Sequence, residues 1–311
     1  MSLQRKPSWG ERLAELAIRA VGMASVALVL LILLFVGKEA IPLFFDPQVR
    51  HEITFGGLFH SHAGPAPYPW QPVSDVPKYN VLPLFVGTLK VTLVSLVIAV
   101  PLSVGAAIFV AEHASERVRG IVKPAIELLA GIPSVVVGFF ALVVMATWVQ
   151  AVLGLDHRLN SIVAGAGLAF AVCPVVFSVS EDALRSVPGS YRAAALALGS
   201  TKAQMVLRVV VPAAGPGIAA AVALGFGRAV GETMIVVLAT GNAAILDVSL
   251  GTSTRTLTAT IAQELGEVVV GSPHYTVLFM LGALLFVITF AINLAGERIV
   301  ASMRRKLGVS P

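Results

Sequence analysis

Two charged residues, Arg228 and Glu232, interrupt a long apolar stretch in the C-terminal part of this sequence, and residues 213–239 contain no other charged side chain. If the stretch is one helix, the two residues are four positions apart and share a face. The guanidinium could hold an oxyanion through paired hydrogen bonds. The carboxylate would fix its geometry and partly neutralise it, so that the anion could be released again.

The cost of such a pair favours a function over simple packing. An arginine at the centre of a bilayer costs at least about 2.5–3.5 kcal/mol on insertion scales, and a buried ion pair rarely stabilises a fold more than apolar residues would. We therefore predict that Arg228 and Glu232 line a substrate pathway. The alternative is an intrahelical salt bridge that only supports packing. Gly227 and Gly231 are predicted to let a second helix approach beside the charges.

The elements that position these residues follow from composition. Of 311 residues, 57% are hydrophobic and 13% charged, against roughly 25% charged in soluble domains. Lipid must therefore be the solvent for much of the chain. Apolar stretches long enough to cross a bilayer occur near residues 18–36, 84–110, 125–149, 161–179, 213–239 and 276–294. The sequence predicts an all-α membrane protein with six transmembrane helices.

The basic residues indicate the orientation. With the N-terminus in the cytoplasm, most of the 22 lysines and arginines fall in cytoplasmic loops or termini, which favours a multi-pass protein with both termini inside. The net charge of +5 is then a topology signal, and no nucleic-acid partner is expected. The first apolar run is predicted to be an uncleaved helix because no clear cleavage site follows it. Lys90 is expected to reach the outer interface from the end of its span, and the alternative is that it attracts the anion.

The chain divides into four predicted regions. These are a cytoplasmic N-terminus with the first helix (1–40), a periplasmic segment rich in proline and aromatic residues (41–83), a five-helix core (84–296) with a cytoplasmic loop (181–212), and a basic cytoplasmic tail (297–311). His60 and His62 lie in the periplasmic segment, and we interpret them as part of a solvated loop rather than a metal site. A second external segment, 242–272, is rich in hydroxyls and predicts a short helix near residues 261–266. Its hydroxyl-rich part is either a β-branched loop or a segment that contacts the substrate.

The cytoplasmic loop has a helical pattern. Residues 191–199 predict a short alanine-rich helix that ends at Gly199, a residue suited to a left-handed C-terminal cap. A second helical stretch covers residues 201–211, and Pro212 is expected to open the next span. A small apolar helix exposed to the cytoplasm is a good docking surface for a partner's groove.

The same loop resembles the cytoplasmic motif of binding-protein-dependent ABC importer permeases. That motif runs Glu-Ala-Ala, three residues, Gly, nine residues, Ile, one residue, Leu-Pro. This chain matches its spacing with Ala193, Ala194, Ala195, Gly199, Val209, Val211 and Pro212. Ala193 stands where the motif has its acidic residue, so shape rather than charge would drive docking.

Further segments resemble the phosphate importer permeases of the PstC type. They are Gly-Arg-Ala-Val-Gly-Glu-Thr-Met at 227–234, Gly-Thr-Leu-Lys-Val-Thr at 87–92, Glu-Leu-Leu-Ala-Gly-Ile-Pro-Ser at 127–134, and Thr-Leu-Thr-Ala-Thr-Ile-Ala at 256–262. The resemblance implies the type I ABC importer permease fold in the bacterial inner membrane. It implies a phosphate pathway at Arg228 and Glu232, and an ATPase-coupling loop that includes Arg192, Ala193, Ala194, Ala195, Gly199 and Pro212.

The resemblance also implies partners. They are a PstA-type second permease, two PstB-type ATPases and a periplasmic phosphate-binding protein. This chain has no Gly-x-x-x-x-Gly-Lys-Ser/Thr phosphate loop, so ATP and Mg²⁺ would be used by the ATPases, and no cofactor, metal or catalytic residue is expected here. Alternatives are a permease for molybdate or sulfate, or the sister PstA-type subunit. An ion channel or an ion-coupled carrier is a different class, and it leaves the cytoplasmic loop unexplained.

Overall fold

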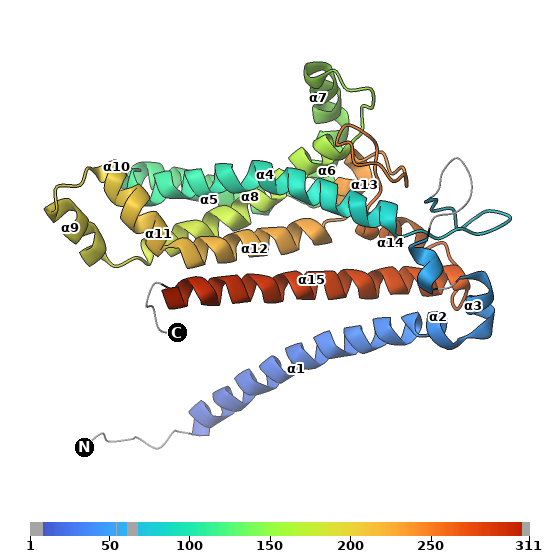
Figure 1. The fold of residues 1–311 in the computed structure, drawn as a ribbon. Helices are drawn as coiled ribbons and strands as arrows, with labels where there is room; N and C mark the ends of the chain where they lie inside the picture. The colour runs from blue at the N-terminus through green and yellow to red at the C-terminus, as the bar shows by residue number, and fades with distance from the viewer. Residues whose placement is uncertain (1–8, 54, 61–67, 307–311) are drawn as a thin grey trace.

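The computed structural model describes residues 9–53, 55–60 and 68–306, and it is helical almost throughout (Figure 1). Its described residues contain no β-strand, only two isolated bridges, Gln71–Lys78 and Gly241–Thr254. His62 lies outside the described residues. The long helices are α1 (Trp9–Ala40), α4 (Leu82–Glu112), α5 (Glu116–Ala130), α8 (Ser161–Arg185), α12 (Gly215–Gly231) and α15 (Pro273–Lys306). The short helices are α2 (Pro42–Phe45), α3 (Pro47–Glu52), α6 (Ser134–Phe140), α7 (Ala146–Leu153), α9 (Gly189–Ala197), α10 (Lys202–Met205), α11 (Val211–Ala213), α13 (Met234–Ala239) and α14 (Leu257–Glu264).

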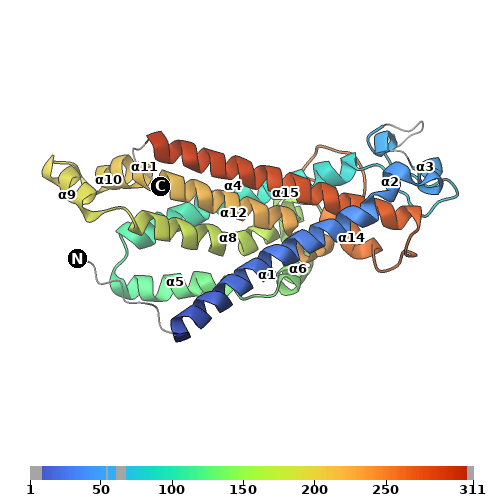
Figure 2. The same cartoon turned by 90° about the horizontal axis from the view of Figure 1, so that it is seen from below.

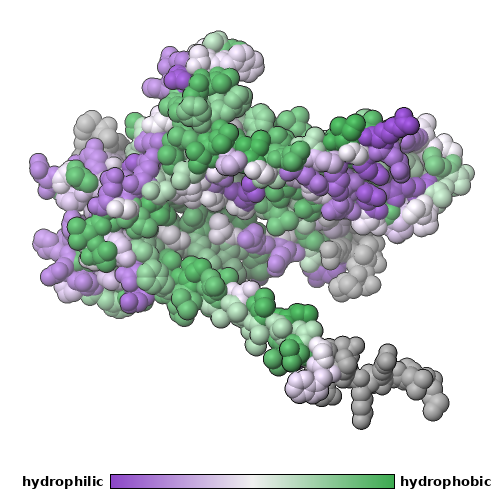
Figure 3. All heavy atoms as spheres, turned by 180° about the vertical axis from the view of Figure 1, so that it is seen from behind, coloured by the Kyte–Doolittle hydropathy of each residue, from purple (hydrophilic) through white to green (hydrophobic). Residues whose placement is uncertain are grey.

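Five helical segments of the described chain are long and apolar enough to cross a membrane, and a bent pair supplies a sixth. The five are Leu13–Phe45, Leu82–Glu112, Ser134–Leu153, Ser161–Arg185 and Pro273–Met303. The bent pair joins Lys202–Ala213 to Gly215–Gly231 at an angle of 66°. Apolar side chains gather over the middle of the molecule and polar ones at its two ends (Figure 3). The prediction of an all-α membrane protein with six spanning segments is confirmed.

The third span begins later than the sequence suggested. Residues 125–149 were expected to form one helix, but the chain breaks after Ala130 and restarts at Ser134. Gly131 and Pro133 lie in the break, and the residue before a proline is disfavoured in a helix. The preceding helix, α5, has no buried residue and lies at the edge of the bundle (Figure 2). The span itself consists of α6, a π-helical turn (Ala141–Met145) and α7.

The fifth span is broken at both ends of α12. Pro212 does not open this span, because it lies inside α11, the last turn of a helix that begins at Lys202 and includes a π turn (Val206–Val210). The chain bends at Ala214, and α12 then starts with Gly215 and Pro216, a proline in the first turn. At its other end α12 stops at Gly231, and α13 begins at Met234. The predicted continuous helix over 213–239 is therefore wrong.

Helices α4, α8 and α12 form the centre of the bundle, and small residues let them approach closely. A Cβ atom on Gly165 of α8 would lie 2.5 Å from Val94 of α4, and one on Gly225 of α12 would lie 2.6 Å from Val176 of α8. A Cβ atom on Gly227 would have one described neighbour within 4 Å, Asn293 Oδ1 at 3.7 Å. A Cβ atom on Gly231 would have no described atom within 4 Å. The neighbour of Gly227 is thus α15, and no described residue lies against Gly231.

The remaining helices surround this centre. Helix α15 packs on α12, and α1 packs on α15, running obliquely to the bundle in Figure 2. Helix α13 packs against α6 and α8. Helix α1 begins, and α15 ends, toward the end of the molecule that carries α9, which we call the α9 end (Figure 1). The opposite end, which carries α14, we call the α14 end. Since α15 reaches Lys306, residues 297–306 of the predicted tail are helical.

At the α14 end, the segment 68–81 is fastened to the helices by one carboxylate. Glu264 accepts hydrogen bonds from Trp70 Nε1 at 3.0 and 3.1 Å, pairs with Arg255 Nη1 at 2.7 Å, and lies 2.9 Å from His274 Nε2. The predicted short helix of this region is α14, which begins four residues earlier than 261 and is capped by the Thr256 hydroxyl. The external segment 68–81 is thus packed on the bundle rather than free of it.

Candidate functional site

The break between α12 and α13 places Arg228 and Glu232 differently from the prediction. Arg228 is in the last turn of α12, whereas Glu232 has left the helix with an extended backbone (φ −70°, ψ 135°). Its Oε1 accepts hydrogen bonds from the N-cap residue Thr233 N at 3.1 Å and from Met234 N, the first amide of α13, at 3.2 Å. Each charge therefore lies at the helix end that favours it, the cation at a C-terminus and the anion at an N-terminus. The expected i,i+4 pair on one helix does not form.

No described residue of this chain pairs with the side chain of Arg228. It is exposed and takes part in no ion pair or side-chain hydrogen bond among the described residues. Leu224 and Gly231 are exposed on the same face of α12, and Leu224 is 53% accessible. A guanidinium on an apolar helix of a membrane protein is costly unless protein or water covers it. We therefore expect protein or water to cover this face of α12.

The backbone of the break is held from α14. Thr258 Oγ1 donates a hydrogen bond of 2.9 Å to the carbonyl oxygen of Glu232, which no helix satisfies. Thr258 also lies 3.2 Å from the hydroxyl of Thr256, the residue that caps α14. The hydroxyl-rich segment therefore contacts the backbone beside Glu232 through Thr258, a contact that the sequence did not predict for this residue. Its signal was the threonine at alternate positions in 256–260.

Lys90 is buried rather than at the membrane interface. It is 6% exposed, and its Nζ donates to the carbonyl of Asp247 at 3.0 Å and to Thr252 Oγ1 at 3.4 Å. Both partners belong to the α13–α14 loop, residues 240–256. The Asp247 carboxylate accepts from Ser249 N at 2.8 Å, and this hydrogen bond lowers the pKa of Asp247. The prediction of a snorkelling lysine is wrong because this loop folds back over α4.

The loop at the α9 end has the predicted form. Helix α9 covers Gly189–Ala197, and Gly199 follows with φ +81°, a conformation in which a glycine avoids the strain of a Cβ. Ala193 and Ala194 are exposed, and Ala195 is buried against the body. The exposed surface of α9 therefore carries Ala193 and Ala194 beside two larger side chains, Tyr191 and Leu196, and α9 contains no acidic residue.

Arg192 fastens α9 to two other helices. Its guanidinium pairs with Glu112 at the end of α4, with Nη2 2.6 Å and Nε 3.2 Å from Oε1. The same group donates to the carbonyls of Leu184 at 2.9 Å and Val187 at 2.5 Å, at the end of α8. The Glu112 side chain is only 6% exposed. Arg192 therefore faces inward and fastens α9 to α4 and to the end of α8.

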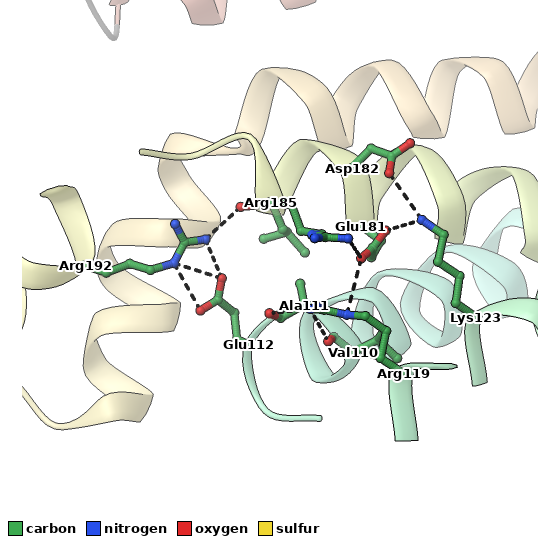
Figure 4. Close-up of polar contacts among 10 residues, drawn as sticks. Val110, Ala111, Glu112, Arg119, Lys123, Glu181, Asp182, Arg185 and Arg192 are labelled. Atoms are coloured by element: carbon green, nitrogen blue, oxygen red, sulfur yellow. Dashed lines mark hydrogen bonds and ion pairs between the residues drawn. The ribbon is translucent and has the colours of Figure 1, made fainter. Parts of the chain in front are cut away.

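A second charge cluster joins α5 to α8 beside this pair, and Figure 4 shows both. Glu181 is wholly buried and lies 2.7 Å from Lys123 Nζ, 3.6 Å from Arg185 and 3.9 Å from Arg119. Arg119 also donates to the carbonyls at the end of α4. The hydrogen bond to Glu181 is the main cause that raises the pKa of Lys123. Neither Glu112 nor Glu181 stood out in the sequence, because both lie near span ends where charge is ordinary.

Comparisons with known proteins agree on the family. The family model described as "Binding-protein-dependent transport system inner membrane component" matches residues 99–305. The "Phosphate transport system permease protein PstC" of Mesorhizobium japonicum is 35% identical over 285 residues, covering 86% of this chain and 84% of the relative. The "Probable ABC transporter permease protein YqgH" of Bacillus subtilis is 38% identical over 224 residues, covering 71% and 72%.

Solved structures show the same fold at low identity. A chain of a bacterial alginate ABC transporter superposes with a TM-score of 0.60 at 17% identity, covering 96% of this chain and 97% of its own. A chain of the MetNI methionine ABC transporter, in an inward-facing form, gives a TM-score of 0.54 at 22% identity and covers 72% and 94%. With its six spanning segments and its α9 loop, the chain belongs to the family of binding-protein-dependent transport-system inner-membrane components, the permeases of ABC importers.

Proposed function

We propose that this chain is the permease subunit of an ATP-driven phosphate importer and that Arg228 contacts the anion during passage. The observation that carries the proposal is the exposure of Arg228, without a partner among the described residues, on an otherwise apolar face of α12. A planar guanidinium with free donors suits a tetrahedral oxyanion. The PstC name of the relatives supports phosphate as that anion.

Glu232 moderates this site. Its carboxylate accepts hydrogen bonds from the backbone amides of Thr233 and Met234, which fix it near the end of α12. A negative charge close to Arg228 lowers the affinity for an anion and allows release into the cytoplasm. The carboxylate therefore acts as a counter-charge held by the backbone, a role that the broken helix suits better than a direct salt bridge would.

The partners follow from the two exposed surfaces. The exposed face of α9 is offered as the docking site for one of the two PstB-type ATPase subunits, which would bind ATP and Mg²⁺. The Arg228 face of α12 is offered to a second, PstA-type permease, so that the pathway lies between the two chains. A periplasmic phosphate-binding protein would deliver the anion at the α14 end. The α9 end is then cytoplasmic, with both termini, as the distribution of basic residues favours.

Uptake of radiolabelled phosphate into proteoliposomes tests the assignment. The chain is reconstituted with its partner permease, ATPases and binding protein, and Arg228→Gln is compared with the parent. We expect uptake to fall at least tenfold, because one charge-assisted contact to an anion is worth about 1.5–3 kcal/mol. Leu224→Gln, one turn away on the same face, is the matched control and should retain most uptake. Full uptake by Arg228→Gln would refute the pathway role.

Sulfate and molybdate in the same assay separate the alternatives. Phosphate uptake that is blocked by excess unlabelled phosphate but not by sulfate or molybdate supports the proposed substrate. Uptake without ATP would instead favour a channel or an ion-coupled carrier.

A further inference from the structure

Two helices of this fold run from the α9 loop to the α13–α14 loop. Helix α4 extends over 31 residues, about 46 Å at 1.5 Å per residue, and α8 packs along it. Val91 and Val94 of α4 contact Gly165 of α8, and Ser103 Oγ of α4 donates to the Cys173 carbonyl at 3.0 Å. These contacts hold the two helices together on both sides of Pro101, the residue that weakens α4. The α4–α8 pair is therefore a continuous unit across the membrane region.

At the α14 end, this pair holds the α13–α14 loop. Lys90 binds the loop at Asp247 and Thr252. Thr88 Oγ1 accepts a hydrogen bond of 3.0 Å from Leu257 N, the first residue of α14, and α8 adds a bond from Ser161 N to the Thr252 carbonyl at 3.3 Å. Gly87 lies directly against the backbone of Arg255, so closely that no side chain would fit. The same α14 holds the Glu232 carbonyl through Thr258.

At the α9 end, both helices hold α9. Helix α8 leads into α9 through Ser186, Val187 and Pro188, and Arg192 returns to the carbonyls at the end of α8. The link to α4 is the ion pair between Arg192 and Glu112, with side chains 23% and 6% exposed. Such a charge-assisted contact with low exposure is directional and well defined. Glu112 is thus the point at which α4 is joined to α9.

We propose that the α4–α8 pair carries movement of α9 to the α13–α14 loop beside Arg228, and that Glu112 is the positioning residue that joins α4 to this movement. The inference rests on the proposed function. A partner that pulls on α9 displaces the end of α4 through Glu112, and α4 displaces α14 through Thr88. The hydrogen bond from Thr258 then moves the backbone of the α12–α13 break. Without Glu112, α4 would follow α9 only through its packing on α8, so less of the movement would reach α14 for each ATP hydrolysed.

Glu112→Gln tests the link, with phosphate uptake and ATP hydrolysis measured in the same proteoliposomes of the complete transporter. Glutamine keeps the size of the side chain but removes the charge, while Arg192 stays bound to the α8 carbonyls, so α9 keeps its place. We expect the ATPase to remain attached and active and the phosphate transported per ATP to fall about tenfold. Glu116→Gln is the matched control, because Glu116 is an exposed carboxylate at the start of α5, four residues after Glu112. Its phosphate transported per ATP should equal that of the parent.

Thr88→Val tests the other end of the unit. Valine keeps the shape of the side chain but cannot accept the bond from Leu257 N, so transport per ATP should fall as it does in Glu112→Gln. Thr289→Val is the control, since among the described residues the Thr289 hydroxyl bonds only carbonyls of its own helix. The proposal is overturned if either test variant transports phosphate per ATP within twofold of the parent. It is also overturned if the ATPase is lost from the transporter with Glu112→Gln. Failure of the parent itself to import phosphate would instead refute the proposed function.

Discussion

Replacing Glu181 with glutamine tests the electrostatic part of the packing at the α9 end. The Glu181 side chain has no solvent exposure and lies within 4 Å of three cationic side chains, at 2.7 Å from Lys123, 3.6 Å from Arg185 and 3.9 Å from Arg119. Glutamine fills the same volume and can still accept a hydrogen bond from Lys123. It removes the negative charge that the three cations share, and it places an amide donor beside them.

The magnitude follows from burial. Removing one partner of a buried ion pair leaves an uncompensated charge and costs about 3–5 kcal/mol. The cations at this site are partly exposed, with 26% accessibility for Lys123, 25% for Arg119 and 51% for Arg185. They can turn toward water, so we expect the lower end, a loss of about 3 kcal/mol in the free energy of unfolding.

The neighbouring residue supplies the control. Asp182 also lies near Lys123, at 3.4 Å, but its side chain is 71% exposed. An exposed ion pair contributes about 1 kcal/mol or less, so Asp182→Asn should change stability little. Both variants are measured by unfolding in mixed micelles with increasing denaturing detergent. A loss for Glu181→Gln no larger than that for Asp182→Asn would refute the reasoning.

The ion pair between Lys123 and Glu181 also predicts how the loss of stability in Glu181→Gln depends on pH. Because the hydrogen bond to Glu181 raises the pKa of Lys123, the stabilisation is fully present below the ordinary lysine value of about 10.4 and is lost only as the pH rises through the higher folded value. The difference between parent and Glu181→Gln should therefore stay constant from about pH 6 to pH 9. A steep change within that range would mean that Lys123 is not the main partner.

Two further predictions concern the ends of the molecule. Gly199→Ala should weaken retention of the ATPase on affinity purification, because a Cβ at φ +81° costs about 1 kcal/mol and turns α9. Gly189→Ala is the control, since a Cβ there meets no described atom within 4 Å, and it should bind the ATPase normally. Glu264→Gln removes the charge on which Trp70, an arginine and a histidine converge, and we expect faster tryptic cleavage of the segment that Trp70 anchors. The exposed Glu267→Gln should be cleaved at the parental rate, and equal rates in both variants would contradict the anchoring role.

Several features of the site could be predicted from the sequence. The charges Arg228 and Glu232 stand out because residues 213–239 are otherwise uncharged. The helix over 191–199 follows from a run of strong helix formers ended by a glycine, and the structure has α9 at Gly189–Ala197 with Gly199 at positive φ. These are local signals, set by the preferences of neighbouring residues.

The breaks in the third and fifth spans were missed, although each has a local mark. Gly131 and Pro133 mark the first, and Gly231 followed by Glu232 and Thr233 marks the second. Hydropathy alone runs through such breaks, because a turn buried in protein need not contain polar residues. A search for glycine followed by a helix-capping residue within apolar stretches would have found the second break.

Composition, the length of the apolar stretches and the spacing of the motif around Gly199 determined that this chain is a multi-span permease, since each depends on residues near one another in the sequence. Tertiary structure alone decided which groups meet. Lys90 lies 157 residues from Asp247, and Glu112 lies 80 residues from Arg192. Such contacts depend on how α4, α8 and the loops pack, and no local pattern encodes them. The residues that fasten the permease together at both ends were therefore visible only in the folded chain.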